Sequence, residues 1–311
     1  FHDTILEGIY KKLFIAAWWV SAEPGDITLE ECKYALNADL EDNDPSSINP
    51  NQITTFPEFV AQVTGYVRSP LRNGDLHLLI DVGAGTVDST VFNVHEEDDE
   101  DIFPIFDKAV KNLGTRFLVK NRLNGTGMIE EGDLGHFSPV PSNNRFSKLL
   151  GITRDELLKI DAEFFRKLHI MVLDSLHYTK QKRYPLSRTW DEGIPIFFCG
   201  GGAKCDFYKD AISRTEELSA FRFIQKEFPM PTDLIADGLG AHEFDRLSVA
   251  FGLSHEPFDI GEIIKSEHVE DIDGDENKEQ RTGSFVCTRC NGTGGLHIHC
   301  DQCGGGGFVH N

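Results

Sequence analysis

Two aspartates flank a glycine-rich bend in the stretch DVGAGTVD, residues 81–88. The bend consists of Gly83, Ala84, Gly85 and Thr86. Glycine allows a bulky anion to approach the backbone, so these amides can converge on phosphate oxygens. Asp81 and Asp88 would repel phosphate unless a cation lay between them, and the pattern therefore predicts magnesium beside a nucleotide. The alternative is a hairpin turn that uses glycine only for its dihedral angles.

A second glycine bend follows the apolar run IPIFFC and consists of Gly200, Gly201 and Gly202. A strand, a glycine bend and a new helix place helix-start amides where the sugar and phosphates of a nucleotide can lie. The alternative is close packing of that helix on the strand. The two bends are more than 100 residues apart and each follows a buried run, which favours one shared ligand site over two packing devices.

Four of the seven cysteines lie in the last 25 residues, in two Cys-x-x-Cys pairs separated by nine residues. They are Cys287, Cys290, Cys300 and Cys303. Two such pairs provide the four thiolates of a tetrahedral zinc site, and a Gly-x-Gly sequence follows each pair at the same offset. His297 and His299 are alternative ligands, and a redox dithiol is an alternative function. The other cysteines, Cys32, Cys199 and Cys205, are expected to be buried thiols.

The surrounding pattern predicts the elements that hold these residues. Strands are expected at about 76–82, 87–94 and 194–199, and a short helix in FPEFVAQVTGYVR, residues 56–68. The acidic run at 95–103 is expected to be a solvent-exposed loop, and 107–123 a helix interrupted near Gly114. The strongest helical periodicity covers 153–183, and further helices are expected after Gly202 and at 244–254. Residues 266–282 have the composition of a linker.

The composition is that of a globular protein with a strong negative charge. The chain has 311 residues, 40% of them apolar, and 51 acidic against 30 basic residues. This balance argues against non-specific binding of nucleic acid. No apolar run approaches the length of a membrane span, and we expect a cytoplasmic protein without membrane contact. Because the chain opens on Phe1, directly within a helical pattern, we expect residues to be missing upstream.

The two glycine bends together resemble a known superfamily. DVGAGTVD resembles the second phosphate motif, and FCGGGA the adenosine motif, of the superfamily that contains actin, sugar kinases and DnaK-type heat-shock ATPases. NLGTRFLVKNRL, residues 112–123, is similar to the segment that follows the phosphate hairpin in the DnaK-type branch, with Thr115 and Leu118 as departures. FPEFVAQVTGYV resembles the connecting helix, with Phe59 in place of a proline. The resemblance spans about residues 52–255.

The resemblance implies an α/β, ribonuclease-H-like lobe that binds ATP with Mg²⁺. Asp81 would lie near the magnesium and its waters, the 83–86 bend would hold the β- and γ-phosphates, and Thr86 would share in catalysis. Glu58 would orient the attacking water, and Asp88 would support the site less directly. Gly200 to Gly202 would line the sugar and α-phosphate. A basic helix in the family contacts adenine, and here it would supply Lys180, Lys182 and Arg183.

The first phosphate motif of the family, Asp-x-Gly-Thr, is absent before residue 52. Either the first lobe is truncated here or the protein is a degenerate relative of the family. The abrupt start favours truncation, and ATP hydrolysis is then expected only where that lobe is complete. The expected organisation is a remainder of the first lobe (1–56), a nucleotide-binding lobe (57–265), an acidic linker (266–283) and a zinc module (284–311). The cysteine repeats resemble the cysteine-rich region of DnaJ-type co-chaperones.

The combined interpretation is a DnaK-like chaperone-type ATPase domain whose zinc module contacts a client or partner protein. Two alternatives remain, a small-molecule kinase of the same superfamily and an actin-like filament protein. We expect no chaperone substrate-binding β-sandwich in residues 266–311, which weakens the chaperone interpretation relative to the two alternatives.

Overall fold

The computed structural model describes residues 4–22, 25–38, 48, 52–97, 100–127, 139–236, 238, 240–256, 261–272, 284–286 and 308–310. The chain forms two compact units, Phe1–Pro57 and Glu58–Asn311. Within the described residues, we find no helix with the length and apolar character needed to cross a bilayer.

The first unit contains two helices, α1 (Thr4–Ala22) and α2 (Leu29–Asn37). Thr28 begins α2 with a capping box, in which its hydroxyl accepts from the amide of Glu31 and the Glu31 carboxylate accepts from the amide of Thr28. Ala16 and Val20 of α1 pack on Ala35 of α2.

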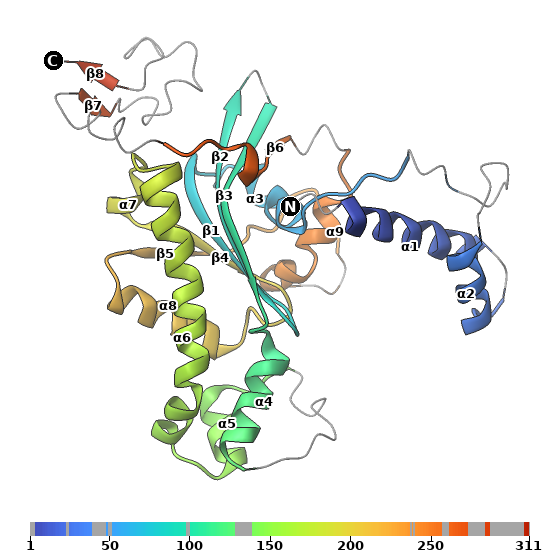
Figure 1. Cartoon of the computed structure of the whole chain (residues 1–311), viewed down its shortest axis with the longest axis horizontal. Coiled ribbons are helices and arrows are strands. Elements are labelled where there is room, and N and C mark those ends of the chain that lie inside the picture. The colour runs from blue at the N-terminus through green and yellow to red at the C-terminus, as the bar shows by residue number, and fades with distance from the viewer. Residues whose placement is uncertain are drawn as a thin grey trace. The chain divides into compact units, whose positions relative to one another are not determined.

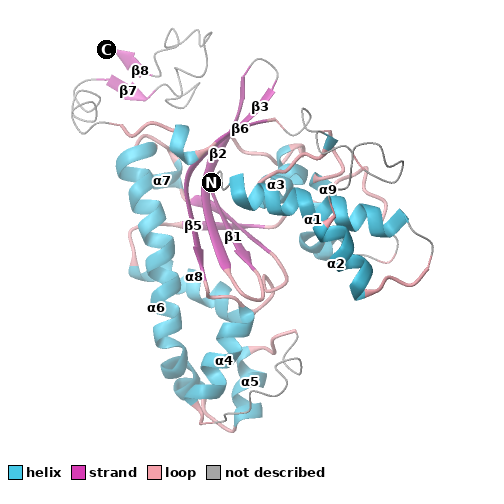
Figure 2. Cartoon of the chain, turned by 45° about the vertical axis from the view of Figure 1, so that its right-hand side comes forward, coloured by secondary structure: helices cyan, strands magenta, loops and turns pink. Residues whose placement is uncertain are grey.

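A six-stranded sheet in the order β5-β4-β1-β2-β3-β6 organises the second unit (Figures 1 and 2). Its strands are β1 (Asp75–Val82), β2 (Val87–Glu97), β3 (Glu100–Lys111), β4 (Ile194–Cys199), β5 (Phe223–Lys226) and β6 (Glu262–Ile264). β2 runs antiparallel to β1 and β3, whereas β4 runs parallel to β1 and β5 parallel to β4. A meander of three strands followed by two parallel strands on the far side of β1 is the ribonuclease-H-like arrangement, which confirms the expected α/β fold class.

Helices cover both faces of this sheet (Figure 1). One face carries α6 (Arg154–Tyr178) and α8 (Asp206–Leu218), and the short helix α7 (Thr189–Glu192) lies between α6 and β4 in the chain. Leu78, Ile80 and Val82 of β1 point into this layer, where Leu168 and Val172 of α6 meet them. Every second residue of a strand faces one side, so the intervening residues of β1 face the other layer.

The other face carries α3 (Glu58–Val67), which packs against α9 (Ser248–Gly252). Phe59 packs on Phe92 of β2, with ring centroids 5.6 Å apart, and Tyr66 hydrogen-bonds to the buried His77 of β1 at 3.1 Å. A Cβ added to Gly252 would lie 2.1 Å from the Ala61 carbonyl oxygen, so this glycine permits the close approach of the two helices. These contacts fix the N-terminal turn of α3 beside the ends of β1 and β2.

The remaining helices and turns continue the chain beyond the sheet. They are α4 (Thr115–Gly125), α5 (Asn143–Leu150), the π-helical turn η3 (Thr179–Arg183), and the 3-10 segments η4 (Ala241–Arg246) and η5 (Ser266–His268). Two short strands, β7 (Ser284–Val286) and β8 (Phe308–His310), pair with each other in antiparallel fashion.

Several expected elements differ from those observed. The acidic run at 95–103 is not a long loop, because β2 continues to Glu97 and β3 begins at Glu100. Residues 107–111 belong to β3, and the helix expected from 107 begins only at Thr115. Pairing with neighbouring strands satisfies the backbone of these polar residues, and a local charge pattern cannot show that.

Candidate functional site

The pairing of β1 with β4 brings the two glycine bends together. Asp81 is opposite Cys199 in this parallel pair, so Gly200 follows directly beside Asp81. A Cβ on Gly200 would lie 2.2 Å from Asp81 Oδ1 and 2.6 Å from the Val82 carbonyl oxygen, and its φ of +80° also favours glycine. The Gly202 amide donates to the same Val82 carbonyl at 2.8 Å. Two motifs far apart in the sequence thus form one surface at the carboxyl ends of parallel strands.

The bend between β1 and β2 points its carbonyl groups toward α4. Thr115, Arg116 and Gly114 donate their amides to the carbonyls of Gly83, Ala84 and Gly85, at 3.0, 2.9 and 3.1 Å respectively. In the described part of the chain, the amides of Ala84 and Gly85 donate no hydrogen bond. A Cβ on Gly85 would meet no atom within 4 Å. Free amides beside open space are what an anion-binding bend requires.

Three carboxylates gather beside this bend. Asp81 and Asp88 are directly opposite each other in the β1–β2 pair, and Gln62 of α3 donates to Asp81 Oδ2 at 2.5 Å. Desolvation raises the pKa of both aspartates. Glu58, in the first turn of α3, has a pKa raised first by desolvation and then by the charges of Asp81 and Asp88. Clustered carboxylates with raised pKa values are a poor arrangement for stability and are typical of functional sites.

The donors of this cluster fit a hydrated magnesium ion. Asp88 Oδ1 and Gln62 Oε1 are buried acceptors without a hydrogen-bond partner. Such atoms are costly unless a cation or a donor satisfies them. Among the described residues, no three acidic, cysteine or histidine side chains are arranged to chelate a metal directly. Mg²⁺ usually retains several waters and takes its other ligands from one or two carboxylates and from substrate phosphates, which matches this arrangement.

A cavity of about 480 Å³ opens beside both bends. Its lining includes Ala84 of the first bend, Gly201 and Gly202 of the second, and the basic side chains of Arg116 and Lys204. The volume is within the usual range for small-molecule sites. A Cβ on Gly201 would meet nothing within 4 Å, so this glycine faces open space. The cavity therefore offers room, positive charge and exposed backbone next to the carboxylate cluster.

Lys180 and Arg183 lie elsewhere, contrary to the expectation that they contact adenine. They belong to η3, at the C-terminal end of α6. Lys180 lies over the rings of Trp190 and Phe221, which adjoin the first residues of β4 and β5, whereas Gly200 follows the last residue of β4. Arg183 forms an ion pair with Asp271 at 2.8 Å. Since α6 is 25 residues long, it spans roughly 37 Å and places its basic end at the opposite end of the sheet from the bends.

The structure describes three of the seven cysteines, Cys32, Cys199 and Cys205. Cys287, Cys290, Cys300 and Cys303, with His297 and His299 between them, lie outside the described residues. Cys199 and Cys205 are buried, and desolvation raises the pKa of both thiols. Cys32 is only half-buried and packs against the α1–α2 contact.

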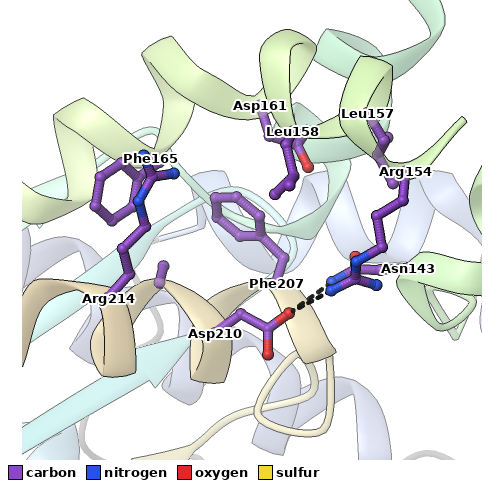
Figure 3. Close-up of a pocket in the computed structure, with 10 residues that line it drawn as sticks. Asn143, Arg154, Leu157, Leu158, Asp161, Phe165, Phe207, Asp210 and Arg214 are labelled. Carbon is purple, nitrogen blue, oxygen red and sulfur yellow. Dashed lines mark hydrogen bonds and ion pairs between the residues drawn. The ribbon is translucent and has the colours of Figure 1, made fainter. Parts of the chain in front are cut away.

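A second, smaller hollow of about 50 Å³ lies between α6 and α8 (Figure 3). At its rim, Asp210 accepts from Arg154 at 3.3 Å and from Asn143 at 3.0 Å. Nearby, the fully buried Arg122 forms an ion pair with Asp161 at 2.7 Å and donates to Asn143. These bonds join α4, α5, α6 and α8, and we assign them a structural role.

Sequence reasoning missed four polar residues near the bends. Gln62 can be placed near the bends only from the packing of α3, and Lys108 only from the register of β3. A local sequence pattern reveals neither of these. The sequence could have indicated Arg116 and Lys204 as basic residues of the site. Lys204 lies two residues after the second glycine bend, and Arg116 follows Thr115, the first residue of α4.

Comparisons with known proteins give only distant likenesses. No protein-family model matches the chain, and no curated protein matches it significantly. Among solved structures, the chain is similar to the ethanolamine utilization protein EutJ from Carboxydothermus hydrogenoformans, with 14% identity, 62% of this chain and 53% of that chain covered, and a TM-score of 0.36. It is also similar to MreB 5 of Spiroplasma citri bound to AMPPNP, with 15% identity, 63% and 56% coverage, and a TM-score of 0.40.

A third likeness is to the PilM-PilN type IV pilus biogenesis complex, with 13% identity, 65% and 52% coverage, and a TM-score of 0.42. The chain spans little more than half the length of these structures. Scores at this level do not define a function, which has to come from the chain's own residues.

Proposed function

We propose that this chain binds Mg-ATP at the surface where its two glycine bends meet. The contact between Gly200 and Asp81 carries the proposal, because it joins the phosphate-type bend and the adenosine-type bend into one site. The free amides of Ala84 and Gly85 are positioned to bind phosphate oxygens. Asp81 and Asp88 would hold a hydrated magnesium ion beside those oxygens, and the ion would offset the repulsion between the two carboxylates and the phosphates.

The cavity would take the nucleoside part of the ligand. Gly201 and Gly202 allow the sugar to approach the backbone, and Arg116 and Lys204 lie where they can contact the α-phosphate or stack on the base. Glu58 would act on the attacking water, since its raised pKa suits a weak general base. We propose ATP hydrolysis as an activity of the complete protein, in which an opposing lobe closes on the nucleotide.

Calorimetry tests the central claim. We expect ATP to bind in the presence of Mg²⁺ and more weakly in the presence of EDTA. Asp81→Asn should weaken the magnesium-dependent part of the binding, whereas Asp210→Asn, which changes an exposed acid of α8, should not. The proposal fails if wild-type protein, supplied with the upstream lobe where it exists, binds no nucleotide.

We further propose that ATP drives a conformational switch of this protein that serves protein quality control. We propose that the four C-terminal cysteines bind one zinc ion and that this module contacts a client or partner protein. The spacing of the cysteines supports it. The antiparallel pairing of β7 with β8 places Val286, just before the first of these cysteines, opposite Phe308. Metal analysis of protein purified without chelator should find one zinc per chain. Zinc-free protein would remove this assignment.

The same nucleotide site would also serve a small-molecule kinase or a filament protein. ADP formation that depends on an added acceptor would identify a kinase. ATP-dependent sedimentation would identify a filament protein.

A further inference from the structure

Lys108 of β3 lies on the sheet face that carries the carboxylate cluster. It is opposite Thr90 in the β2–β3 pair. Asp88 precedes Thr90 by two residues in β2 and is itself opposite Asp81 in the β1–β2 pair. The register is regular from Lys108 to Lys111. Lys108, Asp88 and Asp81 therefore share one face, and rows two residues apart are separated by about 7 Å. An extended lysine side chain covers that distance.

The electrostatics agree with this placement. The positive charge of Lys108 lowers the pKa of Asp81, Asp88 and Glu58. Desolvation raises the pKa of each of these groups and is the larger effect. Lys108, which is half-buried, thus acts on carboxylates from β1, β2 and α3 at once.

We infer that Lys108 binds the phosphate end of the nucleotide, reaching from β3 to the terminal phosphate beside the magnesium ion. The inference rests on the proposed function. A nucleoside triphosphate brings several negative charges to three carboxylates, and magnesium alone does not balance them. A fixed ammonium among those carboxylates is held in place before the ligand arrives, so little ordering is needed when it contacts a phosphate oxygen.

The test compares Lys108→Met with Lys111→Met. Both substitutions remove one positive charge from β3, but the side chain of Lys111 projects from the opposite face. Calorimetry with excess Mg²⁺ measures the affinity for ATP, ADP and adenosine. We expect Lys108→Met to weaken ATP binding about tenfold or more, the usual effect of losing a charged hydrogen bond, and to leave adenosine binding unchanged. Lys108→Arg should keep most of the ATP affinity, and Lys111→Met should behave as wild type.

A second readout separates this role from a structural one. Titration with Mg²⁺ in the absence of nucleotide should show tighter metal binding in Lys108→Met, because a like charge beside the carboxylates is gone. Opposite changes in ATP and Mg²⁺ affinity are not expected from misfolding. Lys108→Gln serves in the same measurements if the Met variant does not fold.

Two results would overturn the inference: wild-type ATP affinity in a folded Lys108→Met protein, or equal losses of ATP and adenosine binding. A wild-type protein that binds neither ATP nor adenosine refutes the proposed function itself.

Discussion

Substituting Gly200 with alanine tests whether the two glycine bends meet as the structure shows. The added methyl group would lie 2.2 Å from Asp81 Oδ1 and 2.6 Å from the Val82 carbonyl oxygen. A left-handed backbone costs a non-glycine residue about 1–2 kcal/mol. Moving Asp81 away would also break its hydrogen bond from Gln62, at a cost of about 1.5–3 kcal/mol for a charged acceptor. We therefore expect Gly200→Ala to lower the free energy of unfolding by about 2.5–5 kcal/mol.

Gly201→Ala is the matched control. Its Cβ would meet nothing within 4 Å, and Gly201 does not have a positive φ, so alanine fits without strain. We expect its free energy of unfolding to stay within about 1 kcal/mol of the wild-type value. Urea unfolding followed by circular dichroism measures both variants, and an unchanged m-value would show that stability alone has changed. Equal stability of the two variants would refute the contact between Gly200 and Asp81.

Three further outcomes follow from the same contacts. Because desolvation raises the pKa of Asp88, its ionised form destabilises the fold once the pH exceeds its unfolded pKa of about 4. Asp88→Asn should therefore gain stability relative to wild type as the pH rises from 4 to 7. Urea midpoints of the two proteins that move in parallel over this range would contradict the prediction. Arg122→Met breaks a buried ion pair and should cost about 3–5 kcal/mol, whereas Arg154→Met, at an exposed pair, should cost less than about 1 kcal/mol by the same assay. Lys180→Met and Arg183→Met should leave ATP affinity unchanged in calorimetry, because both side chains lie at the far end of α6; a clear loss would place adenine there instead.

The sequence was a good guide wherever a short segment determines its own structure. Apolar runs predicted β1, β2 and β4, and helical periodicity predicted α6 almost in full, because burial of a strand or a helix face leaves a regular local pattern. The glycine bends were found for the same reason, since few other residues tolerate Gly200's backbone or the approach of Asp81.

Polar strands were harder to predict. β3 carries charged residues near both ends, on either side of the apolar residues 102–106. It gains stability from pairing with β2 and β6, so its local pattern resembled a loop followed by a helix. The position of Lys180 and Arg183, away from the glycine bends, was hard to predict for a related reason. A basic cluster is visible in the sequence, but the end of the sheet at which it lies depends on the direction in which α6 crosses β1 and β4.

The sequence alone determined the types of group available, namely two glycine bends, three acidic residues and two cysteine pairs, because these types follow from local chemistry. Only the tertiary structure decided which of them meet. The parallel pairing of β1 with β4 joined the bends, the packing of α3 added Gln62 and Glu58, and the register of β3 brought Lys108 to the same face. Such contacts join residues up to about 120 positions apart, and strand register, which no local pattern encodes, sets them.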